Sequence, residues 1–283
     1  MNTKEIAAET IVNASKTRKI ASYIVLCLSA ILTLIPFVVM TLTSLKASQE
    51  LIDVLALPTR FYWGNFQTGL EQIVQGLTNS VLITIPAVTI SIFVGSFAAY
   101  PLSQFRFKGD YIIYMILLSG LFVPFQIVLI PLFQLMRRLS LYDTIPGLWL
   151  VHIAYGIPMC TFFLRNFFVM IPKSLMEASL IDGCSTAGYY RRVLMPLAKP
   201  GLAALFILQF QSIWNDLLFG LTLSHSENVR PVTVGLSSFV GMTDVQYGPL
   251  MASTIVAILP MILVFLLFQR QFISGILGGS VKG

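Results

Sequence analysis

The sequence contains 283 residues, of which 56% are hydrophobic and only 11% are charged. A soluble globular domain carries about 25% charged residues, so this chain has too little polar side-chain surface to form a water-exposed globule. Its net charge of +6, from 18 basic and 12 acidic residues, points either to nucleic acid or to the orientation of a membrane protein.

Long stretches without a charged residue define the predicted elements. They cover residues 20–45, 72–105, 111–136, 144–164, 200–215 and 245–269. A bilayer core needs about 20 apolar helical residues. Five of the six stretches are long enough alone, and the one at 200–215 is completed beyond Asp216. The apolar residues are continuous and do not alternate, which predicts helices and not barrel strands. The expected fold class is therefore an all-α membrane protein with six transmembrane helices.

The basic residues indicate the orientation in the membrane. If the N-terminus is cytoplasmic and the chain crosses six times, 13 of the 18 basic residues lie on the inner side, as the positive-inside rule expects. The pair Arg137 and Arg138 is the one discordant feature. We therefore assign the charge to a lipid bilayer, not to nucleic acid. We predict a multi-pass protein of the cytoplasmic membrane with both termini in the cytoplasm.

In chain order, residues 1–19 are predicted to be a polar cytoplasmic segment, and 20–45 the first transmembrane helix, which is too long for a cleavable signal peptide. Residues 46–74 are expected to form an extracytoplasmic loop. The main transmembrane domain is assigned to residues 75–268, and residues 269–283 to a cytoplasmic tail. Within that domain the expected elements are helices at about 79–103, 111–136, 144–164, 200–223 and 248–268, and a polar insert at 165–199.

Prolines and small residues refine the predicted helices. Pro101 is expected to end the second helix, and Pro124 and Pro131 to break the third, because proline removes a backbone hydrogen bond. Gly95 and Ala99 lie four residues apart on one face of the second helix. Such a pair predicts a seam where another helix approaches closely.

The fifth predicted helix is the most polar. Gln209 and Asp216 are seven residues apart and share a helix face. Asn215 precedes Asp216, which is the only carboxylate inside any predicted span. Two interpretations remain open: polar contacts between helices, or the wall of a polar conduit. His152 lies near the middle of the fourth helix, but no acidic residue lies within a helical turn of it in the sequence, so a proton relay is disfavoured.

Motifs for catalysis or cofactor binding are missing from the sequence. The nearest approach to a phosphate-binding loop, Gly183–Gly188, is followed by two tyrosines and not by lysine. Cys27, Cys160 and Cys184 lack metal or redox spacing. We therefore expect no enzymatic activity, metal or cofactor in this chain, and any energy for transport has to come from another subunit. A secondary transporter would need paired broken helices with inverted repeats, and a membrane enzyme would need clustered nucleophiles, bases or metal ligands.

The polar insert has the composition of a docking element in the segment Glu177–Pro200, EASLIDGCSTAGYYRRVLMPLAKP. Residues 173–181 fit a short helix, and Gly183 can form the turn after it. Ser185 or Thr186 can cap a second short helix, which Pro196 is expected to end. Two short helices at a fixed angle form a rigid element that can transmit a displacement between a cytoplasmic partner and the membrane helices.

This segment resembles the EAA motif of binding-protein-dependent ABC importers. Five positions match the motif: Glu177, Ala178, Asp182, Gly183 and Pro196. The sequence departs from it at Ser179, Cys184 and Met195, which replace alanine, alanine and leucine. With the Trp214–Asp216 element and the GGSVKG end, the six-span pattern is similar to the maltose-transporter-type sugar permeases, specifically the shorter subunit of the pair.

The resemblance implies a type I importer fold and a set of partners. The motif would form a coupling helix docked on one of two cytoplasmic ATPase subunits, which bind the ATP and magnesium. The first helix would pack around a second permease subunit in a heterodimer. An extracytoplasmic solute-binding protein would deliver a sugar. The coupling residues implied are Glu177, Ala178, Ser179, Asp182, Gly183 and Pro196, the tail contacts to the ATPases are Gly278, Gly279 and Lys282, and the candidate path residues are Gln209, Asn215 and Asp216.

One alternative stays open within the same architecture. A type I permease for a peptide, phosphate or polyamine would share the six spans and the insert, since only the tail and the polar residues of the fifth helix favour a sugar.

Overall fold

The computed structural model describes residues 3–51, 53, 56–241 and 245–277, with side chains between residues 19 and 272. In these ranges the chain is helical, and the β-pairing is limited to an isolated bridge between Val240 and Val245. Packing divides the chain into two compact units, residues 1–69 with 246–255 and residues 70–245 with 256–283.

The first unit joins the end of helix α1, Thr3–Ser44, to the start of helix α2, Gly64–Gln104. The Asn65 side chain is buried and donates from Nδ2 to the carbonyls of Ser44 at 3.0 Å and Lys46 at 2.8 Å. It thereby satisfies acceptors that the end of a helix leaves open. The part of α1 at Lys19–Ser44 is long and apolar enough to cross a bilayer, and its most apolar window has no buried residue. The predicted polar segment 1–19 is not separate, because α1 already begins at Thr3.

Helix α2 begins well before its predicted start at residue 79, so the predicted loop 46–74 is shorter than expected. Proline is absent from residues 64–78, and the buried positions Ile73, Ser80, Ile83 and Ala87 recur at helical spacing. The charge of Glu71 had marked the end of the apolar run, but a single exposed charge does not interrupt a helix. At the other end, Pro101 does not terminate α2, which continues to Gln104.

The second unit contains a close approach between α2 and helix α5, Ile145–Val169. A Cβ added to Gly95 would lie 2.4 Å from Cys160 Cβ and 3.1 Å from the Cys160 carbonyl carbon. Ala99, one turn further on, is fully buried. The predicted small-residue seam of α2 is therefore confirmed, because only small side chains allow backbones to approach this closely.

The third predicted span is broken at Pro124, as expected. Helix α3, Asp110–Ser119, continues into the short 3-10 segment η2, Gly120–Phe122, and helix α4, Phe125–Arg138, follows at an angle of 95°. Val123 and Pro124 have extended backbone angles at the break. Pro131, in contrast, lies inside α4 without ending it.

The fifth predicted span, 200–223, is not one helix. Helix α9, Lys199–Trp214, ends before Asn215, and a separate helix α10, Leu218–Leu223, begins after Leu217. The Asp216 carboxylate accepts the Gly220 N–H at 3.2 Å. This side-chain bond gives the backbone an alternative to continuing the helix, and the continuous-helix prediction is wrong for that reason. Within the described part of the chain, four helices are long and apolar enough to cross a membrane alone, or up to six spans result if each bent pair counts as one.

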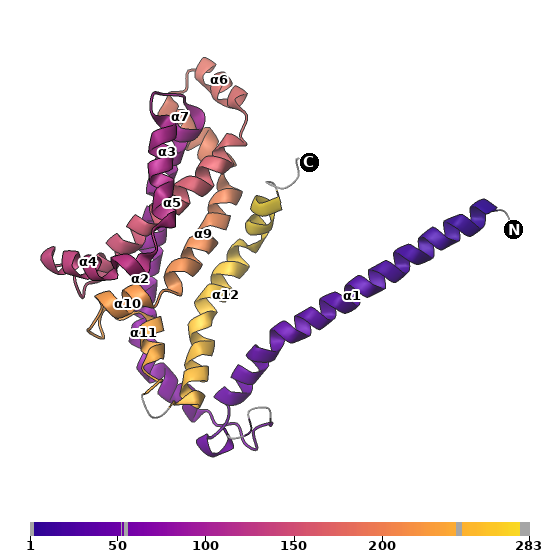
Figure 1. The fold of residues 1–283 in the computed structure, drawn as a ribbon, viewed down its shortest axis with the longest axis vertical. Coiled ribbons are helices and arrows are strands. Elements are labelled where there is room, and N and C mark those ends of the chain that lie inside the picture. Colours follow the sequence, from indigo (N-terminus) through magenta and orange to yellow (C-terminus); the bar gives the residue numbers. More distant parts are fainter. Residues whose placement is uncertain (1–2, 52, 54–55, 242–244, 278–283) are drawn as a thin grey trace. The chain divides into compact units, whose positions relative to one another are not determined.

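Other elements also depart from their predicted ends. Helix α12 runs over Tyr247–Leu277, so the predicted tail from residue 269 starts as helix, and α5 continues five residues into the predicted insert. Within the second unit, Trp214 Nε1 donates to the Ala257 carbonyl at 3.1 Å and links α9 to α12. Helices α6, Lys173–Ile181, and α7, Thr186–Tyr189, lie at one end of this unit, and α10 and α11, Val232–Ser237, lie toward the other (Figure 1).

A side-chain bridge ties two loops at the α10 end. The Asp143 carboxylate accepts the N–H groups of His225 at 2.7 Å and Ser226 at 3.0 Å. Burial raises the pKa of the Asp143 carboxyl, but these hydrogen bonds lower it further, so the net pKa lies below its usual value of 3.8.

Candidate functional site

The first short helix of the predicted coupling insert and the turn after it form as the sequence suggests. Helix α6 spans Lys173–Ile181, the predicted bounds. Gly183 follows with φ of +83°, and a Cβ added there would meet nothing within 4 Å. The glycine is therefore required by the backbone conformation and not by packing. Of the two predicted caps, Ser185 is the one used: its Oγ accepts the Gly188 N–H at 3.1 Å and caps helix α7, Thr186–Tyr189.

The second helical segment is longer than predicted, and Pro196 does not end it. Helix α7 is followed by the π-helical segment η3, Tyr190–Leu194, and by helix α8, Met195–Leu197, which contains Pro196. Proline occupies the first turn of α8, where its missing N–H costs no helical hydrogen bond. The chain bends only after Leu197, where α9 leaves at 73° to the segment Thr186–Leu197.

Buried aromatic side chains anchor this second segment to the membrane helices. Tyr189, Tyr190 and Leu194 belong to one buried cluster with residues of α2 and α5, Ala99, Cys160, Leu164 and Phe168. Tyr190 Oη lies 2.6 Å from Ser96 Oγ of α2. Tyr100 Oη of α2 donates to the Thr186 carbonyl at 2.9 Å. Because packed interiors deform little, a displacement of this segment has to move α2 and α5 with it.

Helix α6 has the opposite character, because it has no buried residue. Leu175, Leu180 and Ile181 are exposed, Ile181 by 86%. Glu177 is exposed on the same short helix. Apolar side chains that gather on an exposed helix are typical of an interaction surface. The insert therefore has one half fixed to the membrane helices and one half open to a partner.

A cavity of about 680 Å³ forms a second candidate site in the second unit. Helix α5 contributes one face, with His152, Tyr155, Gly156 and Met159 at helical spacing, and α9 contributes Gln209 and Ser212. Asn215 and Asp216 line the cavity from the break after α9, and Leu121 and Phe125 from the break between α3 and α4. The three predicted path residues, Gln209, Asn215 and Asp216, thus share one cavity.

Aromatic rings surround one side of this cavity. The Phe219 ring of α10 lies 5.6 Å from the ring of Phe125, 5.6 Å from that of His152 and 5.2 Å from that of Tyr155, between centroids. These four residues come from three helices that are distant in the sequence.

The predicted path residues have different surroundings. The Asp216 carboxylate is held by the Gly220 N–H, and its carbonyl accepts Thr233 Oγ1 at 2.6 Å. Its side chain therefore positions the start of α10, which supports the polar-contact interpretation for this residue. The Gln209 side chain is only 5% exposed and has no hydrogen bond to any described residue.

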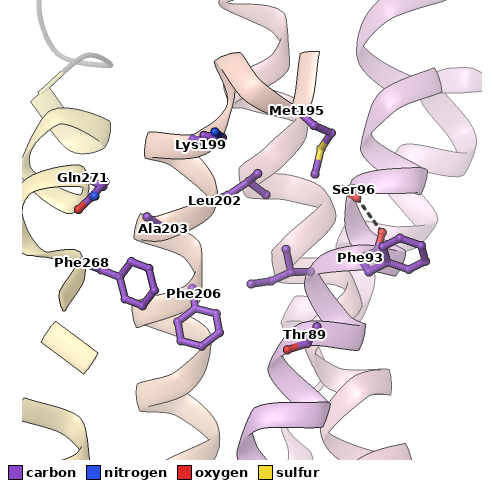
Figure 2. Close-up of a pocket in the computed structure, with 11 residues that line it drawn as sticks. Thr89, Phe93, Ser96, Met195, Lys199, Leu202, Ala203, Phe206, Phe268 and Gln271 are labelled. Atoms are coloured by element: carbon purple, nitrogen blue, oxygen red, sulfur yellow. Dashed lines mark hydrogen bonds between the residues drawn. The ribbon is translucent and has the colours of Figure 1, made fainter. Parts of the chain in front are cut away.

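A third feature is an apolar groove of about 530 Å³ along α2, α9 and α12 (Figure 2). The rings of Phe206 on α9 and Phe268 on α12 have centroids 5.3 Å apart, and Phe93 lines the α2 side. Ser96 directs its hydroxyl to the Phe93 carbonyl at 2.7 Å, and Lys199 lies in the first turn of α9. A groove with so few free polar groups suits a hydrophobic helix or lipid and not a polar solute.

Sequence reasoning missed part of the cavity and could not place the tail. The predicted path residues did not include four that line the cavity: Phe125, His152, Tyr155 and Phe219. His152 has no acidic residue near it in the sequence, but Asp216, in the break after α9, lines the same cavity. A local sequence signal was available only in the spacing of His152, Tyr155 and Gly156 on one face of α5. The predicted tail contacts Gly278, Gly279 and Lys282 lie outside the described residues.

Comparison with known proteins places this geometry in a family. Residues 91–277 match the family described as binding-protein-dependent transport system inner membrane component. An arabinooligosaccharides transport system permease protein from Bacillus subtilis is 33% identical over 272 residues, covering 94% of this chain and 96% of the relative. A diacetylchitobiose uptake system permease protein from Streptomyces coelicolor is 30% identical over 276 residues, covering 95% and 91%.

Two further matches bear on the fold and on the range of relatives. An osmoprotective compounds uptake permease protein from Synechocystis sp. is 37% identical over 227 residues, covering 79% of this chain and 76% of the relative. A chain in the crystal structure of a bacterial ABC transporter involved in import of the acidic polysaccharide alginate superposes with a TM-score of 0.77 at 24% identity, covering 92% and 98% of the two chains. The chain therefore belongs to the family of inner membrane components of binding-protein-dependent transport systems and has the type I ABC importer permease fold.

Proposed function

We propose that this chain is one permease subunit of a sugar importer and that helix α6 couples it to a cytoplasmic ATPase subunit. The observation that carries the proposal is the division of the insert into an anchored half, around Tyr189 and Tyr190, and an exposed half, α6. The names of the relatives, for arabinooligosaccharides and diacetylchitobiose, support a sugar as the solute. ATP and magnesium are bound by the partner ATPases.

In this mechanism the ATPase subunits move α6, and the movement passes through Gly183 and Ser185 into the buried tyrosines and so into α2 and α5. The residues Glu177, Ala178, Ser179, Asp182, Gly183 and Pro196 belong to this coupling unit. The breaks at Pro124 and at Asn215–Leu217 border the cavity of about 680 Å³. Rotation of α5 and α9 therefore changes the shape of the conduit that Gln209, Asn215 and Asp216 line.

The partners follow from the surfaces that remain uncovered. The apolar window of α1 and the groove between Phe93, Phe206 and Phe268 both suit helices of a second permease subunit in a heterodimer. An extracytoplasmic binding protein delivers the sugar, and two ATPase subunits contact α6 and the C-terminal tail, including Gly278, Gly279 and Lys282. Both termini are cytoplasmic in this arrangement.

The coupling role is tested by retention of the ATPase during affinity purification of this chain from co-expressing cells. Glu177→Ala and Ile181→Asp change exposed side chains of α6, so the chain itself is expected to fold, while ATPase retention falls severalfold. Glu227→Ala, at an exposed position between α10 and α11, is the matched control and retains the ATPase. Equal retention by all three variants and the wild type contradicts the docking role of α6.

A non-sugar solute is the second candidate, because one relative is named for osmoprotective compounds. Proteoliposomes with the full complex and binding protein, offered arabinooligosaccharides, diacetylchitobiose, glycine betaine and a short peptide, separate the two candidates. Uptake confined to the betaine or the peptide overturns the sugar assignment and leaves the importer assignment in place.

A further inference from the structure

Resting on the proposed function, we infer that this subunit holds the solute itself during translocation, through a subsite for uncharged hydroxyl groups formed by His152 and Gln209 beside the ring of Phe219. The subsite lies within the cavity of about 680 Å³ between α5, α9 and α10. The sugar is then bound by this chain and not only by its partner permease.

The first observation is a pair of buried polar side chains without hydrogen-bond partners. Gln209 is 5% exposed and His152 is 8% exposed, and neither side chain has a hydrogen bond to another described residue. They come from different helices, α9 and α5, and both line the same cavity. Their nitrogen and oxygen atoms are not sealed off from the cavity, so a ligand that fills the cavity can form hydrogen bonds with both groups.

The second observation is the space made for the Gln209 amide. A Cβ added to Gly156 of α5 would lie 2.2 Å from Gln209 Nε2. Glycine at this position therefore lets the amide lie against the α5 backbone, one helical turn beyond His152 on the same helix. The close approach of the Gln209 amide to Gly156 restricts the position of the amide. A larger side chain at position 156 would therefore displace it.

The chemistry of the lining favours a neutral polyhydroxylated solute. An amide offers a carbonyl acceptor and two N–H donors, and a neutral imidazole offers one donor and one acceptor, which match hydroxyl groups that both donate and accept. The rings of Phe219 and Tyr155 provide an apolar face against which a sugar ring can pack. Among the described residues that line the cavity there is no lysine or arginine, so a phosphate or an acidic sugar lacks a counter-charge.

A polyamine is equally poorly matched. The described residues that line the cavity include one carboxylate, Asp216, and that group already accepts the Gly220 N–H. We assign Asp216 a positioning role through α10, which carries Phe219. The solute contacts belong to His152 and Gln209.

The test uses the whole complex in proteoliposomes with its binding protein, and the probe is whichever of arabinotriose, diacetylchitobiose and xylose the wild type transports fastest. The measured quantity is sugar transported per ATP hydrolysed. A solute that is released into the cavity but not held there escapes, so hydrolysis proceeds without transport. Gln209→Ala and His152→Leu are expected to lower this ratio about fivefold each, the effect of losing one hydrogen bond, with the stimulated ATPase rate unchanged. His152→Gln, which keeps a donor and an acceptor, retains most of the ratio.

Two further variants separate contact from folding. Gln211→Ala changes an exposed glutamine two residues further along α9, outside the cavity lining, and leaves the ratio unchanged. Gly156→Ala displaces the Gln209 amide and lowers the ratio, and its additional effect in the Gln209→Ala background measures the separate clash of the new Cβ with Ser91, whose Oγ and Cβ would lie 2.7 and 3.0 Å away.

Each remaining outcome counts against a defined claim. If the wild type transports a probe and Gln209→Ala and His152→Leu keep the wild-type ratio, the subsite is overturned and the sugar importer stands. If ATPase rate and transport fall together in these variants, the two side chains are structural and the inference is wrong. If no probe is transported, both the subsite and the sugar assignment fall.

Discussion

Two adjacent tyrosines in the coupling insert give opposite predictions for the same substitution. Tyr189 is fully buried, and its hydroxyl has no hydrogen-bond partner among the described residues. Tyr190 is also buried, but its hydroxyl lies 2.6 Å from Ser96 Oγ. Since the Ser96 hydroxyl donates to the Phe93 carbonyl at 2.7 Å, Tyr190 is the donor to Ser96.

The magnitudes follow from these contacts. Tyr190→Phe removes one buried hydrogen bond and is expected to lower the free energy of unfolding by about 1 kcal/mol. Tyr189→Phe removes a buried hydroxyl that pays a desolvation cost without a bond, and is expected to raise stability by about 1 kcal/mol. For a chain of this size the two variants should differ in Tm by about 6 °C.

Cys160 provides the assay. It is fully buried at the seam with Gly95, whereas Cys27 is exposed and Cys184 is partly exposed. In a Cys27→Ser, Cys184→Ser background of the purified complex, a thiol-reactive dye labels this chain only when the seam opens. The dye bound to this chain is measured in its gel band after heating to a series of temperatures. The temperature of half-maximal labelling is the midpoint of unfolding.

The result that refutes the reasoning is equally specific. If Tyr190→Phe leaves the midpoint unchanged, the bond to Ser96 does not hold the insert to α2. If Tyr189→Phe lowers the midpoint as much as Tyr190→Phe, the Tyr189 hydroxyl has a partner that the geometry does not show. Ser96→Ala combined with Tyr190→Phe completes a double-mutant cycle for the bond itself.

Three other predictions concern the turn, the seam and the loop bridge. Gly183→Ala and Gly109→Ala both place a side chain at positive φ with open space around it, so each costs about 1 kcal/mol of stability. Only Gly183→Ala is expected to lower the sugar transported per ATP hydrolysed, and an equal loss in both variants would contradict a specific role of the insert. Gly95→Ala is expected to lower the free energy of unfolding by about 2 kcal/mol, because it overpacks the seam with Cys160. The dye should then label Cys160 at a lower temperature, and an unchanged labelling midpoint would show that α2 and α5 can separate freely. The Asp143 carboxyl has a folded-state pKa below its unfolded value, so its contribution to stability is present above about pH 4 and is lost as the pH falls through the folded pKa. Asp143→Asn should therefore reduce the loss of stability toward low pH, measured as the thermal unfolding midpoint from pH 3 to 6. An unaltered pH profile would refute a stabilising role of the Asp143 carboxylate.

The helix-breaking positions show where sequence reasoning succeeds and fails. Pro124 breaks its span as predicted, whereas Pro101, Pro131 and Pro196 are each accommodated inside a helix. Proline removes a backbone hydrogen bond in the interior of a helix but none in its first turn. Whether an interior proline ends the helix depends on the packing around it, which a local pattern does not contain. The break after Trp214 has no proline, and it arises from the Asp216 side chain bonding to the backbone of the next helix.

Local sequence was sufficient to predict the membrane class, the short helix Lys173–Ile181 and the glycine turn after it, because hydrophobic length and turn chemistry act over a few residues. Packing between distant helices sets the burial of one half of the insert and the exposure of the other, and it brings His152 and Gln209 to one cavity. Those facts depend on which helix faces lie against each other, and the apolar faces of membrane helices look alike whether they contact lipid or protein.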